Sequence, residues 1–233
     1  MIKKIVSFLD LLFSERCALC GALLIPERPW AYPLCETCVD SLPERNGLIC
    51  SSCSSPLVSE DGICTRCRER AYAFSFNYSL FLYEGRVREL IHQYKNKNCK
   101  SLSGFFADRM AALIVRRFSE YLVVPVPFRA ARKRARGWDQ IEAICRKLRG
   151  THGIASRRLL KRERSPAQKT LDYAGRLSNL EGKICVLKKA RPPEKILLID
   201  DVFTTGATAD ICAGVLKKAG TSEVCVLTIA LDQ

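Results

Sequence analysis

One stretch restricts the fold of this 233-residue chain more than any other, residues 195–208 with the sequence KILLIDDVFTTGAT. After Lys195 come four apolar residues, 196–199, which is typical of a parallel strand buried on both faces. Asp200 and Asp201 follow where this strand is expected to end, at the edge where open α/β sheets bind ligands. A loop of small residues then leads into a helix that we expect to end at Gly220, with an apolar face formed by Ile211, Val215, Leu216 and Ala219.

This loop and the acid pair have the chemistry of a sugar phosphate site. A loop that feeds a helix N-terminus presents free backbone N–H groups to a phosphate, and Gly206 lets the backbone come close. Paired carboxylates suit vicinal hydroxyls, or hydroxyls shared with Mg²⁺. The alternative is an ordinary strand–turn–helix with a capping Asp, but adjacent acids on a buried strand are costly without a ligand or partner. The expected phosphate-binding residues are Thr204, Thr205, Gly206, Ala207 and Thr208.

Residues 197–208, LLIDDVFTTGAT, closely resemble the phosphoribosyl pyrophosphate (PRPP) motif of type I phosphoribosyltransferases. The run is not a Walker A motif, because no Gly-Lys-Ser/Thr follows the loop. The resemblance implies that Asp200 and Asp201 hold the ribose 2- and 3-hydroxyls and that residues 204–208 hold the 5-phosphate. It also implies Mg²⁺ between the pyrophosphate and the ribose hydroxyls.

Eight of the thirteen cysteines form four CxxC pairs in residues 17–67. Each pair offers two thiolates to one metal, and two pairs complete a tetrahedral Zn²⁺ site, so about two structural zinc ions are expected. We favour sequential pairing, first with second and third with fourth, which gives a double zinc ribbon. Interleaved pairing into a cross-braced module is the alternative. The predicted ligands are Cys17, Cys20, Cys35, Cys38, Cys50, Cys53, Cys64 and Cys67.

Two other interpretations of the cysteine pairs are less consistent with the sequence. Disulfides require a secretory environment, and a redox CxxC would normally occur once near a βαβ unit. A segment this short cannot build a large apolar core, so bound metal should supply folding energy directly. The other cysteines are expected to be small buried apolar residues: Cys99, Cys145, Cys185, Cys212 and Cys225.

Positive charge is concentrated in one part of the chain. The net charge is +14, and residues 127–176 contain 15 Lys or Arg against 4 Asp or Glu. Such a segment indicates a polyanionic partner, which is a phosphorylated ligand, nucleic acid or both. A buried strand at 121–126 precedes a loop whose guanidinium groups could hold a pyrophosphate, and a solvated loop is the alternative. The cations of this loop are Arg129, Arg132, Lys133, Arg134 and Arg136.

A second basic segment, 159–180, contains Arg164 and Gln168 and lies upstream of two strands expected at 183–187 and 195–200. We interpret it as a hood loop that folds over the sugar site and excludes water. A nucleic-acid contact and a plain surface loop are the alternatives.

Together these features resemble the ComF family, phosphoribosyltransferase-like proteins associated with DNA uptake and natural competence. The matching features are the CxxC-rich start, VPVP at 124–127, the Arg-rich loop ending in GWDQ at 137–140, SPAQ at 165–168, and the PRPP motif. Asp139 stands where the family usually has Asn, Trp138 where Phe or Tyr is common, and Ser165 where Thr is usual. The resemblance implies PRPP contacts from Arg134, Arg136 and Gln140, with Arg136 at the pyrophosphate leaving group.

The predicted organisation is an N-terminal helix and double zinc ribbon in residues 1–70, followed by a phosphoribosyltransferase-like domain in residues 71–233. The second part is an α/β fold, a mostly parallel sheet flanked by helices, by its resemblance to type I phosphoribosyltransferases. It should open with a strand in 73–83 and continue with helices at 86–94 and 105–118. The first of these helices has an apolar face of Val87, Leu90, Ile91 and Tyr94, with His92 beside it and Lys95, Lys97 and Lys100 in the polar loop that follows.

No segment has the ~20 apolar residues needed to span a bilayer. Residues 1–13 are expected to form a short amphipathic helix on the zinc module, because Asp10 interrupts the apolar run and no cleavage site follows. A helix peripheral to the inner membrane is the alternative. A cytoplasmic location is expected.

The predicted function is a ComF-type protein that binds PRPP and Mg²⁺ and acts in DNA uptake or utilisation. Asp200, Asp201 and Arg136 are the expected catalytic residues of a phosphoribosyl transfer whose acceptor no local pattern specifies. One rival is a non-catalytic competence factor that binds single-stranded DNA or the uptake machinery through its zinc ribbons and basic segment. A nucleobase-salvage enzyme is less favoured, because salvage enzymes need no zinc module.

Overall fold

The computed structural model describes residues 15–24, 32–43, 45, 47–58, 62–128, 137–163 and 182–233. In this part of the chain, β1 (Phe76–Leu82), β6 (Glu223–Leu231), β5 (Lys195–Phe203) and β2 (Leu122–Pro125) form a four-stranded sheet in the order β1-β6-β5-β2. All of its neighbouring strands run parallel. A smaller antiparallel pair is formed by β3 (Leu160–Arg162) and β4 (Ile184–Val186).

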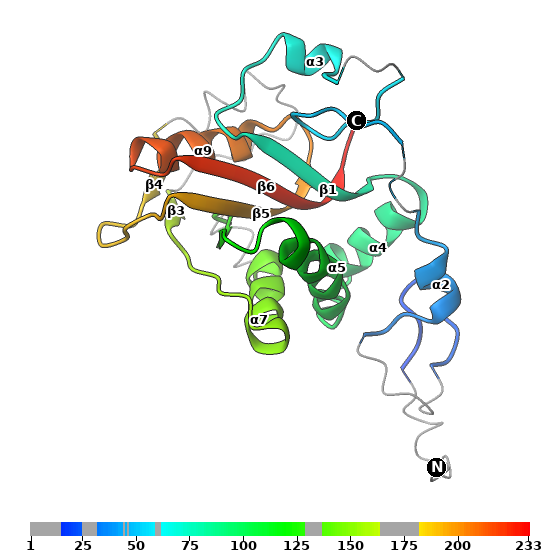
Figure 1. Cartoon of the computed structure of the whole chain (residues 1–233). Coiled ribbons are helices and arrows are strands. Elements are labelled where there is room, and N and C mark those ends of the chain that lie inside the picture. Colours follow the sequence, from blue (N-terminus) through cyan, green and yellow to red (C-terminus); the bar gives the residue numbers. More distant parts are fainter. Residues whose placement is uncertain are drawn as a thin grey trace.

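Helices cover both faces of the parallel sheet (Figure 1). One face is covered by α4 (Gly85–Asn96), α5 (Leu102–Arg117) and α7 (Gln140–His152), and the other by α9 (Ala207–Lys218). Alternate residues of β5 enter the two cores, Leu197 and Ile199 on the α5 side and Ile196 and Leu198 on the α9 side. The apolar run is therefore buried on both faces as predicted, and the predicted fold class is confirmed.

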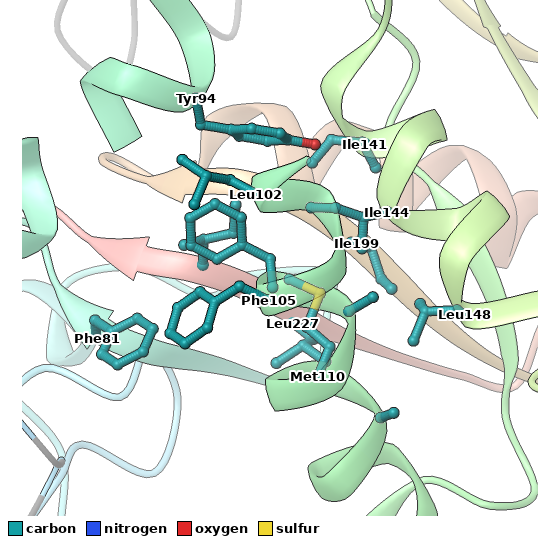
Figure 2. Packing of buried hydrophobic residues seen from close by; sticks show 14 of the residues in the cluster. Phe81, Tyr94, Leu102, Phe105, Met110, Ile141, Ile144, Leu148, Ile199 and Leu227 are labelled. Atoms are coloured by element: carbon teal, nitrogen blue, oxygen red, sulfur yellow. The ribbon is translucent and has the colours of Figure 1, made fainter. Parts of the chain in front are cut away.

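The core beneath α5 is built from aromatic and branched side chains. Figure 2 shows Phe105 and Met110 of α5 beside Leu227 of the sheet, in the same cluster as Tyr94 of α4 and Ile144 of α7. The Tyr94 hydroxyl donates to the backbone carbonyl of Gln140 at 2.7 Å and so links α4 to the start of α7. The helix predicted at 86–94 is confirmed, because all four members of its expected apolar face are fully buried: Val87, Leu90, Ile91 and Tyr94.

The structure corrects four details of the sequence prediction. The strand predicted to end near Asp200 continues to Phe203. It stays paired with β6 as far as Leu231, although its pairing with β2 stops at Pro125. The predicted apolar face of α9 is wrong in part, because Ile211 and Val215 are only partly buried and Ala219 is exposed. Mostly small residues face the sheet instead, and they let the helix approach it closely. Lys95 belongs to α4 rather than to the following loop, and Cys99 and Cys185 are only partly buried. The buried residues of α9 are Ala207, Ala209, Cys212, Ala213 and Leu216, whereas Ala219 is exposed.

The cysteine-rich residues pack against the sheet at two separate places. Cys17, Cys35 and Cys38, with the short helix α2 (Glu36–Asp40), join the core on the α5 side, where Tyr32 meets Phe105 edge-on at 5.3 Å. The last four, with α3 (Thr65–Arg68), join the core on the α9 side. The division into residues 1–70 and 71–233 stays a proposal, since both cysteine groups share apolar clusters with the sheet.

The second cysteine group also covers the outer edge of β1. The Asn77 N–H of β1 donates to the Ser52 carbonyl at 2.8 Å, and Arg45 donates to the Ser79 carbonyl at 2.9 Å. An edge strand presents unpaired backbone groups, and these contacts satisfy some of them. Among the helices of the described ranges, none is long and apolar enough to cross a membrane. The amphipathic helix expected at 1–13 lies outside the described residues.

Candidate functional site

The acid pair lies on β5 just beyond the last rung that β5 shares with β2, the pair Pro125 and Ile199. Because side chains alternate along a strand, the two carboxylates point to opposite faces of the sheet. Asp201 lies on the α4 side, where its Oδ2 is 2.5 Å from Lys95 Nζ. Asp200 lies on the α9 side and pairs in register with Thr228 of β6.

Backbone N–H groups hold both carboxylates in place. The Asp201 N–H donates to Asp200 Oδ1 at 2.8 Å, and the Val202 N–H donates to Asp201 Oδ1 at 2.6 Å. Burial, followed by the negative charge of Asp201, raises the pKa of the Asp200 carboxyl to about 7, against the opposing effects of the Asp201 N–H, Lys95 and Arg162. The site is therefore short of positive charge, which makes it suited to a cation or to ligand hydroxyls.

The loop after β5 and the start of α9 line a small, partly open cavity of about 30 Å³. Asp200 lines it together with Thr228 and residues 202–209, so Asp200 and the predicted phosphate loop open onto the same space. Gly206 is held at φ +81°, and a Cβ there would come within 2.7 Å of Phe203 Cζ and 2.9 Å of Tyr72 Cε1. Only glycine fits this position, which explains why the loop is built around it.

Helix α9 begins directly at this cavity. Its first residue, Ala207, donates its N–H to Thr205 Oγ1 at 3.4 Å, and the Asp210 N–H donates to the Gly206 carbonyl at 2.8 Å. The N-terminus of a helix of this length has a partial positive charge that favours an anion. The cavity lining therefore combines a close backbone approach, threonine residues and a helix N-terminus with the carboxyl-bearing Asp200.

The structure adds four residues that the sequence interpretation missed. Lys95 was expected in a polar loop. The sequence feature that could have placed it on the helix is its position one residue after the buried Tyr94. Thr228 is a lone hydroxyl within an apolar strand and bonds Ser79 Oγ at 2.7 Å, a pattern that marks a polar site inside a sheet. Arg66 and Tyr72 donate to the carbonyls of Thr204 and Thr205, and no sequence signal connected these distant segments.

Several predicted ligand residues lie outside the described part of the chain. These are Arg134 and Arg136, together with the hood residues Arg164 and Gln168, so their roles stay predictions. Gln140 is described: it is the first residue of α7 and is fully buried. Its side-chain amide has no hydrogen-bond partner within the ranges that the structure covers, which leaves a polar group available to a ligand or to an adjoining segment. His92, by contrast, is exposed on α4.

The eight cysteines of the CxxC pairs form two groups of four. Cys17, Cys20, Cys35 and Cys38 make one group and Cys50, Cys53, Cys64 and Cys67 the other, with the sulfur atoms of each group within 4.8 Å of one another. This is the sequential pairing favoured from the sequence, and the interleaved alternative is wrong.

The geometry of both groups fits zinc. A tetrahedral site with Zn–S bonds of about 2.3 Å places its sulfur atoms about 3.8 Å apart. The Cys20 and Cys35 sulfurs are 3.7 Å apart, and those of Cys53 and Cys64 are 3.6 Å apart. All thirteen cysteines are free, and an N–H donates to a sulfur at the equivalent position of each group, from Cys35 to Cys17 at 3.4 Å and from Cys64 to Cys50 at 3.3 Å. Two similarly built sites therefore offer the thiolate ligands that structural zinc prefers.

Comparison with known proteins agrees with this organisation. The family model of a double zinc ribbon domain matches residues 8–68. The competence protein ComFC of Streptococcus pneumoniae is 26% identical over 82% of this chain and 84% of its own length. The competence protein F of Haemophilus influenzae is 24% identical over 94% of this chain and 97% of its own. The DNA utilization protein YhgH of Salmonella typhimurium is 24% identical over 88% of this chain and 93% of its own length. The predicted resemblance to ComF proteins is confirmed.

Among solved structures, the chain is similar in part to an enzyme of purine biosynthesis and to a phosphoribosyl transferase. The allosteric regulatory enzyme of purine biosynthesis matches 56% of this chain at 19% identity and a TM-score of 0.38, and the match spans 26% of that enzyme. A hypoxanthine phosphoribosyl transferase of Trypanosoma cruzi matches 57% of this chain at 13% identity and a TM-score of 0.35, and the match spans 64% of its length.

We expect the purified protein to contain about two Zn²⁺ per chain, because two Cys₄ groups have tetrahedral spacing. Metal analysis by mass spectrometry checks this. Cys64→Ser should reduce the content to about one ion, while Cys185→Ser, a cysteine outside both groups, should leave it unchanged. Protein with free thiols and no metal would contradict the zinc assignment.

The raised pKa of Asp200 predicts a pH-dependent stability for the protein without ligand. Between the ordinary carboxyl pKa of 3.8 and about 7, the folded state binds more protons than the unfolded state, so this group's contribution to stability decreases as pH rises through that window. Asp200→Asn should remove the effect. Its melting temperature should exceed that of the wild type by several degrees at pH 8 and by much less at pH 5. A difference that does not change with pH would contradict the assigned environment of Asp200.

Proposed function

We propose that this relative of the ComF-type competence proteins binds PRPP with Mg²⁺ at the cavity between Asp200 and residues 204–208, and acts in DNA uptake or utilisation. The proposal rests on one observation above all. The acid-bearing strand β5, the threonine-rich loop and the N-terminus of α9 line one partly open cavity, so groups suited to a diol and to a phosphate lie next to each other.

The 5-phosphate would lie at the start of α9. Thr204, Thr205 and Thr208 line the cavity and would offer their hydroxyls, and Gly206 would let the backbone N–H groups of the loop reach the phosphate oxygens. Charge-assisted hydrogen bonds from N–H groups to an anion are stronger than neutral ones. This arrangement needs no lysine in the loop, because the helix N-terminus and the backbone supply the positive potential.

The ribose hydroxyls and Mg²⁺ would be held by the acid pair. Asp200 has a carboxyl whose ionisation is disfavoured, and a cation or a set of hydroxyl donors relieves that cost. Asp201 is held by Lys95, and this ion pair keeps a second carboxylate charged at the edge of the sheet. We assign the pyrophosphate to Arg134, Arg136 and Gln140, and closure over the site to Arg164 and Gln168, on the sequence motifs alone.

If the protein turns over, the reaction transfers the phosphoribosyl group to an acceptor and releases pyrophosphate. Asp200, Asp201 and Arg136 are then the proposed catalytic residues, acting by positioning the ribose and by stabilising the charge of the leaving group. A pyrophosphate-release assay with bases, nucleosides and single-stranded DNA as acceptors tests for this activity. A cytoplasmic location is part of the proposal.

The rival function is a nucleic-acid-binding competence factor without turnover. It is favoured by the 15 cationic residues in 127–176 and by relatives whose names refer to competence and DNA utilization. A nucleobase-salvage enzyme has no such observation behind it and would not account for the two Cys₄ groups. PRPP binding without release of pyrophosphate to any acceptor would support the rival.

Replacing both acids, Asp200→Asn with Asp201→Asn, should weaken PRPP binding by about a hundredfold or more. The reason is the loss of at least two charge-assisted hydrogen bonds, each worth roughly 1.5–3 kcal/mol. Stability should be unchanged or slightly raised, because removing the repulsion between the carboxylates offsets the loss of the ion pair between Asp201 and Lys95. Calorimetry with Mg²⁺ and PRPP, together with a thermal melt, measures both effects.

A matched control for the double variant removes two carboxylates away from the cavity, Asp108→Asn with Glu120→Gln. This control should bind PRPP as the wild type does. Unchanged affinity in the Asp200/Asp201 variant would refute the site, and a collapsed melting temperature would show that the pair is structural.

The basic segment predicts DNA binding that is sensitive to salt. The logarithm of the affinity for a single-stranded oligonucleotide should fall steeply with the logarithm of the salt concentration, because cations release counterions from the phosphates. Arg146→Gln with Lys147→Gln, on the exposed face of α7, should reduce the slope. Lys217→Gln with Lys218→Gln at the end of α9 is the control with the same charge change. A shallow dependence in the wild type would show that these charges serve the small ligand instead.

A further inference from the structure

We propose that the second cysteine ribbon is a structural part of the phosphate site, and that Arg66 and Tyr72 are positioning residues that orient the loop through the carbonyls of Thr204 and Thr205. This inference rests on the proposed function, since it concerns the same loop. Occupancy of the second Cys₄ group then affects affinity for the phosphate, whereas occupancy of the first does not.

Arg66 connects the metal ligands to the loop directly. It lies in α3 between the ligands Cys64 and Cys67, so the CxxC knuckle fixes where its side chain begins. Its Nη1 donates to the Thr204 carbonyl at 3.2 Å, and its Nη2 lies 3.8 Å from Cys53 Sγ. Nη2 also donates to Ser55 Oγ at 3.2 Å, so one guanidinium group spans the ribbon and the loop.

Tyr72 supports the next carbonyl of the loop. Its hydroxyl donates to the Thr205 carbonyl at 3.0 Å, and its ring stacks on Phe74 with the centroids 4.6 Å apart. The same ring would meet a Cβ added at Gly206. The adjacent Ala73 N–H donates to Asp210 Oδ1 at 2.6 Å and fastens the first turn of α9. The segment from α3 to β1 therefore forms the back wall of the loop.

These contacts determine which way the N–H groups of the loop point. In a planar trans peptide, the carbonyl and the N–H of the next residue point in opposite directions. A Thr204 carbonyl held toward Arg66 turns the Thr205 N–H away from the ribbon, and a Thr205 carbonyl held toward Tyr72 does the same for the Gly206 N–H. Because Thr205 and Gly206 also line the cavity, these contacts present the N–H groups of both residues to the phosphate.

Arg66 also balances charge at this wall. A Zn²⁺ ion with four thiolates has a net charge of about −2, which would disfavour a phosphate nearby. A guanidinium group between the sulfur of Cys53 and the loop offsets part of this charge and donates to both sides. Loss of the metal would release the knuckle that positions Arg66, and so would disturb the Thr204 carbonyl.

The first ribbon provides an internal comparison. Arg86 of α4 lies 3.6 Å from Cys38 Sγ and donates to Ser41 Oγ at 2.9 Å, so it contacts the first group much as Arg66 contacts the second. Both of these partners lie in the first ribbon, and neither lies in residues 204–208. Arg86→Ala therefore removes the same chemistry at the other metal site without touching the loop.

The test is calorimetry with ribose 5-phosphate as the probe, on full-length protein whose zinc content is measured in parallel. Arg66→Ala should bind about tenfold more weakly than the wild type, and Tyr72→Phe, which removes one hydroxyl donor, about threefold more weakly. Arg86→Ala should bind as the wild type does. Arg66→Lys should rescue binding partly, because it restores a cation without the two-armed geometry. A general loss of stability would lower the melting temperature without this pattern of affinities.

A second arm changes the metal sites themselves. Cys64→Ser in the second group should weaken ribose 5-phosphate binding, and Cys20→Ser in the first should not. Tyr72→Phe keeps both metal sites, so it decides the question even if the cysteine variants do not fold. Wild-type affinity in both Arg66→Ala and Tyr72→Phe, at about two zinc ions per chain, would overturn the inference. A wild type that binds neither ribose 5-phosphate nor PRPP would overturn the proposed function instead.

Discussion

The structure depends on one constraint, that a strand apolar on both sides must be covered on both faces before it ends in two carboxylates. Helices α5 and α7 cover one face of β5 and α9 covers the other, so the apolar run 196–199 is fully buried. A carboxylate within that run would lose its hydration without compensation. The ladder with β2 ends at Ile199, and the first position that is no longer buried on both faces is occupied by Asp200. The site is therefore located where the covering of the sheet stops.

The charges at this edge come from different elements and face different sides. Lys95 reaches Asp201 from α4, while Asp200 faces the α9 side, where burial raises its pKa to about 7. Alternation along the strand thus gives two chemically adjacent carboxyls unlike environments. One is charged and paired, and the other readily takes up a proton, a cation or ligand hydroxyls. Two carboxyls in unlike environments suit the proposed diol and Mg²⁺ better than two equivalent carboxylates would.

The sequence predicted those parts of the fold and site that depend on local pattern. The buried strand, the glycine loop and the cysteine knuckles were identified because apolar runs, φ-positive glycines and CxxC spacing act within a few residues. The direction in which each Asp points and the partner of Lys95 depend on strand pairing and helix docking, which pattern alone does not specify. The extension of β5 to Phe203 was missed because it is decided by the length of β6, a strand that follows 20 residues later. The contacts of Arg66 and Tyr72 join segments more than 130 residues apart, and neither residue stands out from its neighbours.

The two cysteine ribbons have different relations to the sheet, and this difference bears on why a zinc module accompanies such a fold. The first packs on the face of the sheet that α4 and α5 cover, where it adds to an already large core. The second lies at the open edge of β1 and continues, through Asn77, Ser79 and Thr228, as a chain of buried polar contacts that reaches the cavity lining. Buried polar groups are stable only when each has partners, so this chain requires the ribbon to be folded. A metal that organises the ribbon would thereby also organise the polar groups next to residues 204–208, because Thr228 and this loop line the same cavity. On the inference above, the second ribbon would then form one wall of the proposed site.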